Sequence, residues 1–169
     1  MACCRRGPLL SAPCGSLQGS TTSTLAGATV YSYRGVPYAQ PPVHTLRLQR
    51  PRPLQPWQGV RDARGEATKS LQPHVLAPEK HILSEGKEDC LQLSVFTKTS
   101  PSAGRGTKMP VVVFLHGGAF VIGSCESALY GPQVLSSSTY NFLGSVGPRR
   151  GSGWSELPPG TSGLAQSGL

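Results

Sequence analysis

The ten residues from Val111 to Phe120, VVVFLHGGAF, constrain the fold of this chain more than any other stretch. An uninterrupted apolar run follows Pro110, which is typical of a strand covered on both faces of an α/β sheet. The run is too short to cross a membrane as a helix. It ends in His-Gly-Gly-Ala, where the lack of side-chain bulk lets consecutive backbone N–H groups turn outward. These residues predict either a turn that binds an oxyanion or only a tight turn after a strand.

Composition limits the size of the core and the kinds of partner. The chain has 169 residues, of which 37% are hydrophobic, with 21 glycines and 16 prolines, so any core is concentrated in a few strands. The formal net charge is +8, and no acidic residue precedes Asp62. Because the arginines lie among prolines and form no dense basic run, we expect a solvated surface and no nucleic-acid partner.

Neither a metal site nor another cofactor is expected. The chain has five cysteines, with no CxxC pair and no histidine at the spacing of metal ligands: Cys3, Cys4, Cys14, Cys90 and Cys125. Near the N-terminus only Leu9 and Leu10 form an apolar patch, which is shorter than the core of a secretory signal. No apolar stretch is long enough to span a bilayer, so we expect neither a signal peptide nor a membrane span.

The regions before Val111 predict strands and one long loop. From Gly15 to Tyr38, β-branched and aromatic residues alternate with small polar ones, which predicts a small antiparallel meander. The passage from 43 to 88 begins with a proline-rich arm, where three prolines exclude a helix interior and a central strand: Pro51, Pro53 and Pro56. The alternation of Leu91, Leu93 and Val95 then predicts a half-buried strand.

Several motifs together resemble the type-B carboxylesterase and cholinesterase family of α/β-hydrolases. Residues 34–42, RGVPYAQPP, are similar to the family's RGIPYAxPP, and residues 88–95, EDCLQLSV, to its EDCLxLNV with Ser94 in place of asparagine. The arm carries the family's P-W-x-G-V-x-D-A positions, and HGGAF resembles its oxyanion turn. The resemblance covers about Gly15 to Pro132. It implies an α/β-hydrolase fold, N-terminal part only, with a meander and the first strands of the central sheet.

Family members hydrolyse carboxylic esters with a nucleophilic serine, while backbone N–H groups stabilise the tetrahedral intermediate. By this resemblance, a small-molecule carboxylic ester is the expected partner. The expected N–H donors are Gly118 and Ala119, with Gly117 allowing the turn. No G-x-S-x-G sequence occurs in the 169 residues, and no histidine matches the catalytic base: His44, His74, His81 and His116. We therefore expect a truncated member, without triad nucleophile, acid or base, that is inactive alone.

Two alternatives to this function stay open. One is a non-catalytic adhesion or binding module of the same family. The other is a basic nucleic-acid-binding chain, for which there is charge but neither a motif nor an aromatic platform. A downstream G-x-S-x-G favours the enzyme, and an intact domain without it favours the binding module.

The resemblance also implies particular contacts and departures. An ion pair between Arg47 and Glu88 is expected to tie the arm to the strand that follows. His44 stands where the family usually has glycine, which is expected to distort the turn after Pro42. The cysteine that bridges to the family's EDCL motif is absent from residues 67–79, so Cys90 is expected to be a buried free thiol. Pairing of Cys90 with Cys14 or Cys125 is the alternative.

These expectations divide the chain into three regions. Residues 1–14 are expected to be an unstructured N-terminus and residues 15–135 a partial carboxylesterase domain. Residues 136–169 have no hydrophobic period and are expected to be a disordered tail, which an altered reading frame or splice would explain. Family members are often secreted or lumenal, but neither the localisation nor the oligomeric state of this chain follows from its sequence.

Overall fold

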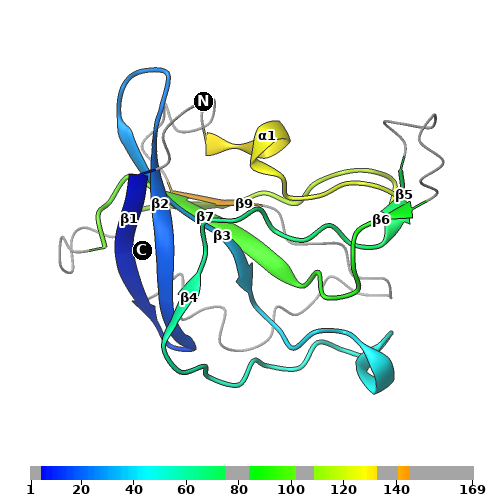
Figure 1. Ribbon diagram of the computed structural model, residues 1–169. Helices are drawn as coiled ribbons and strands as arrows, with labels where there is room; N and C mark the ends of the chain where they lie inside the picture. The colour runs from blue at the N-terminus through cyan, green and yellow to red at the C-terminus, as the bar shows by residue number, and fades with distance from the viewer. Residues whose placement is uncertain (1–4, 75–83, 102–108, 133–140, 145–169) are drawn as a thin grey trace.

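The computed structural model describes residues 5–74, 84–101, 109–132 and 141–144. A seven-stranded sheet has the order β1–β2–β3–β7–β9–β8, with β4 beside β2 (Figure 1). Its strands are β1 (Arg5–Ala12), β2 (Gly15–Ser23), β3 (Thr29–Pro37), β4 (Val60–Asp62), β7 (Gln92–Thr97), β8 (Val111–Val113) and β9 (Asn141–Gly144). The pairs β2–β4 and β8–β9 are parallel, and the other pairs are antiparallel.

Short elements complete the described structure. They are the two-stranded ladder β5 (Gln72–Pro73) and β6 (Ser84–Glu85), the 3-10 turn η1 (His44–Leu46) and the helix α1 (Ser127–Tyr130). Within the described ranges, no helix has the length and apolar character needed to cross a membrane.

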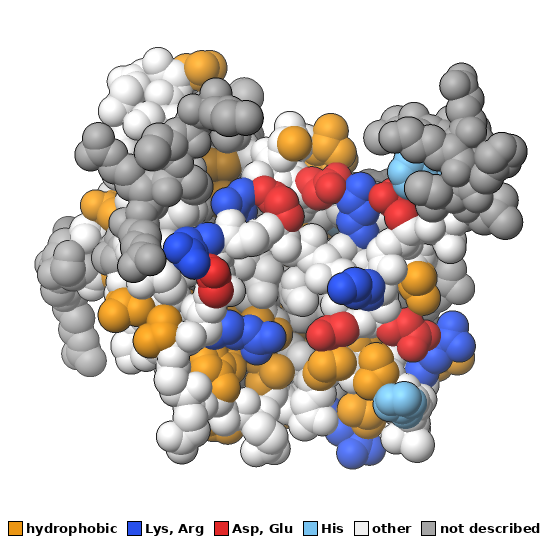
Figure 2. All heavy atoms as spheres, in the orientation of Figure 1, with side chains coloured by type: hydrophobic (Ala, Val, Ile, Leu, Met, Phe, Trp, Pro, Cys, Tyr) orange, Lys and Arg blue, Asp and Glu red, His pale blue; other side chains and the backbone are white. Residues whose placement is uncertain are grey.

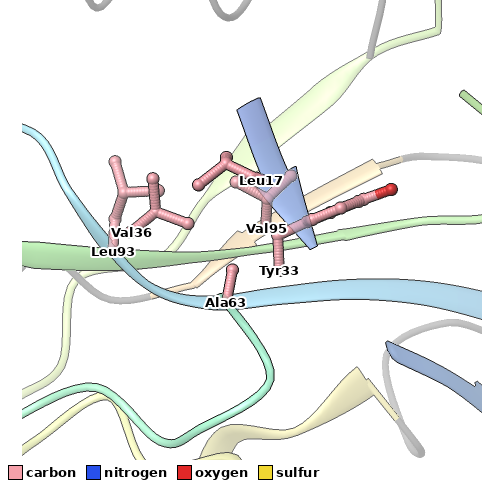
Figure 3. Close-up of a cluster of buried hydrophobic side chains, with 6 residues drawn as sticks. All are labelled: Leu17, Tyr33, Val36, Ala63, Leu93 and Val95. Carbon is pink, nitrogen blue, oxygen red and sulfur yellow. The ribbon is translucent and has the colours of Figure 1, made fainter. Parts of the chain in front are cut away.

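The predicted meander is present as β2 and β3. The two strands pair antiparallel from Ser20–Ser32 to Ser23–Thr29. In β3, Tyr33 and Val36 are buried, and they pack with Leu17 of β2 and with β7 (Figure 3). The alternation of β-branched, aromatic and small residues therefore predicted this part of the sheet correctly.

The expectation that residues 1–14 are unstructured is wrong for residues 5–12, which form β1. Their backbone pairs antiparallel with β2, and the register shifts between Arg6 and Leu9. Pro8 lies within that shift, where a residue without an N–H interrupts the ladder least. The sequence pattern did not predict this strand. Its hydrogen bonds come from the backbone of β2, and a strand at the edge of a sheet needs few apolar side chains.

The proline-rich arm lacks regular structure between η1 and β4, as the prolines predicted. Ala63 is buried in the main cluster (Figure 3). The partly buried Trp57 packs against this cluster. The indole N–H of Trp57 donates to the carbonyl of Ser16 at 3.1 Å. A Cβ on Gly15 would lie 2.4 Å from this ring nitrogen, so glycine is required where the arm meets β2.

Strand β7 is more buried than its alternation predicted. It lies between β3 and β9, and every residue from Leu93 to Thr97 is buried. Leu93 and Val95 join the main cluster, whereas Phe96 packs with Val30 and Phe114 in a second one. The half-buried prediction was wrong because Ser94 and Thr97 are polar and yet fully enclosed.

Strand β8 forms where the apolar run predicted it, but it lies at the sheet edge and is not covered on both faces. Its valines are 40–49% exposed. The neighbour of β8 is β9, which the sequence did not predict because its residues fall in the region expected to be disordered. The rest of residues 133–169 lies outside the described residues. An apolar edge of this kind is a surface that other protein segments normally cover.

Candidate functional site at the turn after β8

The turn that follows β8 has an unusual backbone. Gly118, Ala119 and Phe120 have φ angles of 124°, 52° and 60°. The N–H groups of Val121 and Ile122 both donate to the carbonyl of Gly118, at 2.9 and 3.0 Å. A Cβ on Gly118 would lie 1.8 Å from the carbonyl oxygen of Ile122. The sequence needs glycine at this position because both the φ angle and the close backbone approach exclude a side chain.

The carbonyls within the turn fix the directions of two N–H groups. His116 Nδ1 lies 2.8 Å from the carbonyl oxygen of Gly117, so Nδ1 carries the proton when it donates this bond. Because a trans peptide is planar, fixing the Gly117 carbonyl fixes the N–H of Gly118 on its opposite side. The bonds to the Gly118 carbonyl fix the N–H of Ala119 in the same way. No described residue accepts a hydrogen bond from either N–H.

Gly123 packs directly against this arrangement. A Cβ on Gly123 would lie 2.4 Å from His116 Nδ1 and 2.5 Å from the carbonyl oxygen of Gly117. Its φ angle is 121°, a conformation that favours glycine. The backbone of Gly123 therefore sets where the His116 ring and the Gly117 carbonyl can lie.

Serines lie near the turn, but the described residues contain no serine–histidine pair. Ser124 Oγ bonds Glu126 Oε2 at 3.2 Å, and Ser127 Oγ bonds the carboxylate of Glu66. The His116 ring bonds within its own turn, and His74 Nε2 lies 4.0 Å from Glu85. His44 is exposed in η1, and His81 lies outside the described residues. A hydroxyl without a general base is a poor nucleophile near neutral pH.

The three described cysteines are free: Cys14, Cys90 and Cys125. Cys90 is buried, as expected for a thiol without a partner. Burial raises the pKa of the Cys125 thiol to about 11 and also raises the pKa of Cys90, where the charge of Asp89 adds to it. Cys125, in the loop after the turn, is also buried, at 7% exposure. Both thiols stay protonated at neutral pH and are unsuited to nucleophilic attack.

Arg47 and Glu88 lie where the resemblance placed an ion pair. Arg47 Nε is 2.7 Å from Glu88 Oε1, and the side chains are 60% and 34% exposed. Arg47 follows η1, and Glu88 precedes β7 by a few residues. The contact therefore joins the beginning of the arm to the central strand, but in an environment open to solvent.

No residue between Ala63 and Glu88 was predicted to belong to the site. Gln72 nevertheless contacts the loop after the turn, since its side-chain amide makes two hydrogen bonds to Gly123. A glutamine in a two-residue strand such as β5 has no periodicity that marks it, and the contact spans 51 residues. The described residues contain no cluster of histidine, cysteine or acidic side chains able to hold a metal ion.

Solved structures with the same fold define the class. The juvenile hormone esterase from Manduca sexta superposes with a TM-score of 0.72 at 29% identity, over 95% of this chain and 31% of that one. The carboxylesterase EST55 from Geobacillus stearothermophilus gives a TM-score of 0.66 at 28% identity, over 83% of this chain and 26% of that one. The fold is that of an α/β-hydrolase esterase, of which this chain holds the N-terminal part.

Sequence comparison identifies the family within this class. The family model described as "Carboxylesterase family" matches residues 6–142. Esterase FE4 of Myzus persicae is 35% identical over 163 residues, which cover 93% of this chain and 28% of the relative. Human Carboxylesterase 3 is 37% identical over 128 residues, which cover 68% of this chain and 22% of the relative. The chain belongs to the carboxylesterase family and spans less than a third of the length of these relatives.

Proposed function

We propose that the turn from Gly117 to Ala119 is the oxyanion hole of a carboxylic ester hydrolase. The N–H groups of Gly118 and Ala119 donate to the oxygen of the tetrahedral intermediate, and Gly117 allows the chain to turn. The observation that carries the proposal is that each of these N–H groups is oriented by a hydrogen bond to the carbonyl of the same peptide. Donors held in advance stabilise a developing negative charge without reorganising, which is what such a site requires.

The substrate that this proposal implies is a small-molecule carboxylic ester. The relatives named above are esterases, and the oxyanion of an ester intermediate is the anion such a turn serves. Removing one donor from a complete site costs about 3–4 kcal/mol of transition-state stabilisation. The donors stabilise an intermediate that a nucleophile must first form, and the described residues contain no activated serine. The described residues therefore contribute donors to the reaction without supplying its nucleophile.

A non-catalytic binding module of the same family is the second candidate. The apolar surface that β8 exposes, and the side chain of Phe120 at 73% exposure, are the observations that favour it. Such a surface suits contact with another protein more than contact with water.

Sequencing transcripts of this gene across the codon for Leu135 separates the two candidates. If a product continues from Pro132 to a G-x-S-x-G sequence, we expect that product to hydrolyse aryl esters. Changing Gly118 to alanine in it should lower kcat by about 10²- to 10³-fold with little change in KM. A complete domain without that serine, and without ester hydrolysis, contradicts the proposed function and supports the binding module.

A further inference from the structure

Three side chains of one segment hold the loop that follows the glycine turn. Glu66, Lys69 and Gln72 are spaced three residues apart. They contact Ser127, Glu126 and Gly123, in that order, so the two segments run in opposite directions. We call these six residues the loop clamp. Figure 2 shows basic and acidic side chains next to one another across this face of the molecule, which fits a surface organised by short charge contacts.

Gln72 makes the contact nearest to the turn. Its Oε1 accepts a hydrogen bond from the N–H of Gly123 at 2.7 Å, and its Nε2 donates to the carbonyl of Gly123 at 3.1 Å. The amide thus satisfies both backbone groups of one residue, as a neighbouring strand would. Gln72 is 6% exposed, so water does not readily replace these two bonds.

The other two contacts hold the far end of the loop. Lys69 Nζ lies 3.1 Å from both Glu126 and Glu85. Burial by itself lowers the pKa of Lys69, but the hydrogen bonds to these carboxylates outweigh burial and raise it. The Glu66 carboxylate accepts the N–H of Ser127 at 3.0 Å and also binds Arg34. Because these contacts fix residues 126 and 127, Gln72 has only a short span of loop to orient.

We propose that Gln72 is a positioning residue for the oxyanion donors, an inference that rests on the proposed function of the turn. Gln72 fixes the backbone of Gly123, and Gly123 confines the His116 ring and the Gly117 carbonyl. The bond from His116 to that carbonyl then sets the direction of the Gly118 N–H. Gln72 thereby acts on the donors through Gly123 and does not touch the substrate.

The test compares two glutamines in the full 169-residue chain. Gln72→Leu removes both bonds to Gly123 and leaves a side chain of similar length. Gln40→Leu is the matched control, since Gln40 Nε2 also donates to a backbone carbonyl, that of Pro53 at 3.0 Å, far from the turn in sequence. Mass spectrometry measures the rate of amide hydrogen exchange in two peptides. A peptide covering residues 114–126 reports on the turn, and one covering β7 reports on the sheet. Chymotrypsin cleavage after the exposed Phe120 gives a second readout of the same turn.

We expect Gln72→Leu to speed exchange in residues 114–126 by about tenfold or more, because two hydrogen bonds are lost, and to leave β7 unchanged. Cleavage after Phe120 should accelerate in parallel. Gln72→Glu keeps the acceptor for the Gly123 N–H and should fall between the wild type and Gln72→Leu. Gln40→Leu should behave as the wild type in both readouts.

Unchanged exchange and cleavage at the turn in Gln72→Leu would overturn the inference. Equal acceleration in β7 and in the turn would also overturn it, because it would mean that Gln72 only supports the whole fold. These results do not depend on ester hydrolysis. If the inference about Gln72 is refuted, the proposed function of the turn still stands. If the proposed function is refuted, the exchange pattern expected for Gln72→Leu does not change.

Discussion

Arg47 Nε lies 2.7 Å from Glu88 Oε1 and links the start of the proline-rich arm to the residues before β7. The link is open to solvent, since the Arg47 side chain is 60% exposed. An ion pair in such surroundings is screened by water and salt and contributes at most about 1 kcal/mol. A buried pair, in contrast, costs about 3–5 kcal/mol when one partner is removed.

A double-mutant cycle with Arg47→Met and Glu88→Gln tests this difference. We expect a coupling free energy of unfolding below about 1 kcal/mol, which decreases further at high salt. The quantity is obtained from urea denaturation of the wild type, both single variants and the double variant. A coupling near 3 kcal/mol that is insensitive to salt would show that the pair acts as a buried one.

The two glycines of the turn should differ in their tolerance of a methyl group. Gly118→Ala places a Cβ 1.8 Å from a backbone oxygen and should lower the free energy of unfolding by about 2 kcal/mol or more. Gly117→Ala is the control, because a Cβ there meets nothing within 4 Å. Thermal or urea unfolding of the two variants measures the difference. Equal effects would mean that the turn does not have the described backbone.

The φ angle of His44 is +49°, which explains why the resemblance places glycine at this position. In this left-handed region of the backbone, a residue with a side chain is about 1–2 kcal/mol less favourable than glycine. Glycine keeps only part of this advantage, because its unfolded chain has more conformational freedom. We expect His44→Gly to raise the free energy of unfolding by about 0.5–1 kcal/mol. Thr45→Gly, in the same 3-10 turn without a positive φ angle, should lower it. A lower free energy of unfolding in His44→Gly would show that the backbone at His44 is not strained.

Alkaline pH should destabilise the fold through two groups buried in their neutral forms. Burial raises the pKa of Cys125 from 9.0 to about 11, and burial, with a smaller effect of Tyr31, raises that of Tyr33 from 10.0 to about 12. The unfolded chain loses these protons first. The stabilisation is therefore complete below pH 9.0 and is lost as the pH rises through the two folded-state values.

Urea midpoints measured from about pH 8 to about pH 11 test the alkaline effect. Cys125→Ala should flatten the lower part of this decline, where the thiol of the unfolded chain ionises before the tyrosine does. Cys14→Ala, at a thiol that is only partly buried, is the comparison. An identical decline in the wild type and in Cys125→Ala would remove Cys125 as a cause.

The sequence predicted the elements whose side chains carry their own periodicity. The meander from Gly15 to Tyr38 and the strand at Val111 were found because apolar and β-branched residues mark them. Strands β1 and β9 were not predicted, since their pairing depends on the backbones of β2 and β7. The burial of Ser94 was also missed, because a short polar side chain in a strand gives no sign that a second layer covers it.

The same limit applies to the candidate site. The glycines of the turn were predicted because a strand followed by His-Gly-Gly-Ala is visible in the sequence. Gln72 was not, because its two bonds to Gly123 connect residues 51 positions apart and require both loops to be in place. Local pattern thus predicts the glycine turn, and only the tertiary structure shows that Gln72 contacts the loop after it.

The most direct test of the account is the chemistry of the purified 169-residue chain. The chain is incubated with an activated aryl ester and, separately, with a fluorophosphonate probe that labels activated serines. We expect ester turnover at the background rate and no stoichiometric labelling, because the proposed oxyanion hole cannot act without a nucleophile and the described residues contain no serine–histidine pair. Stoichiometric labelling with burst kinetics, abolished by changing Ser124 or another single serine, would contradict the account and show that the chain contains its own nucleophile.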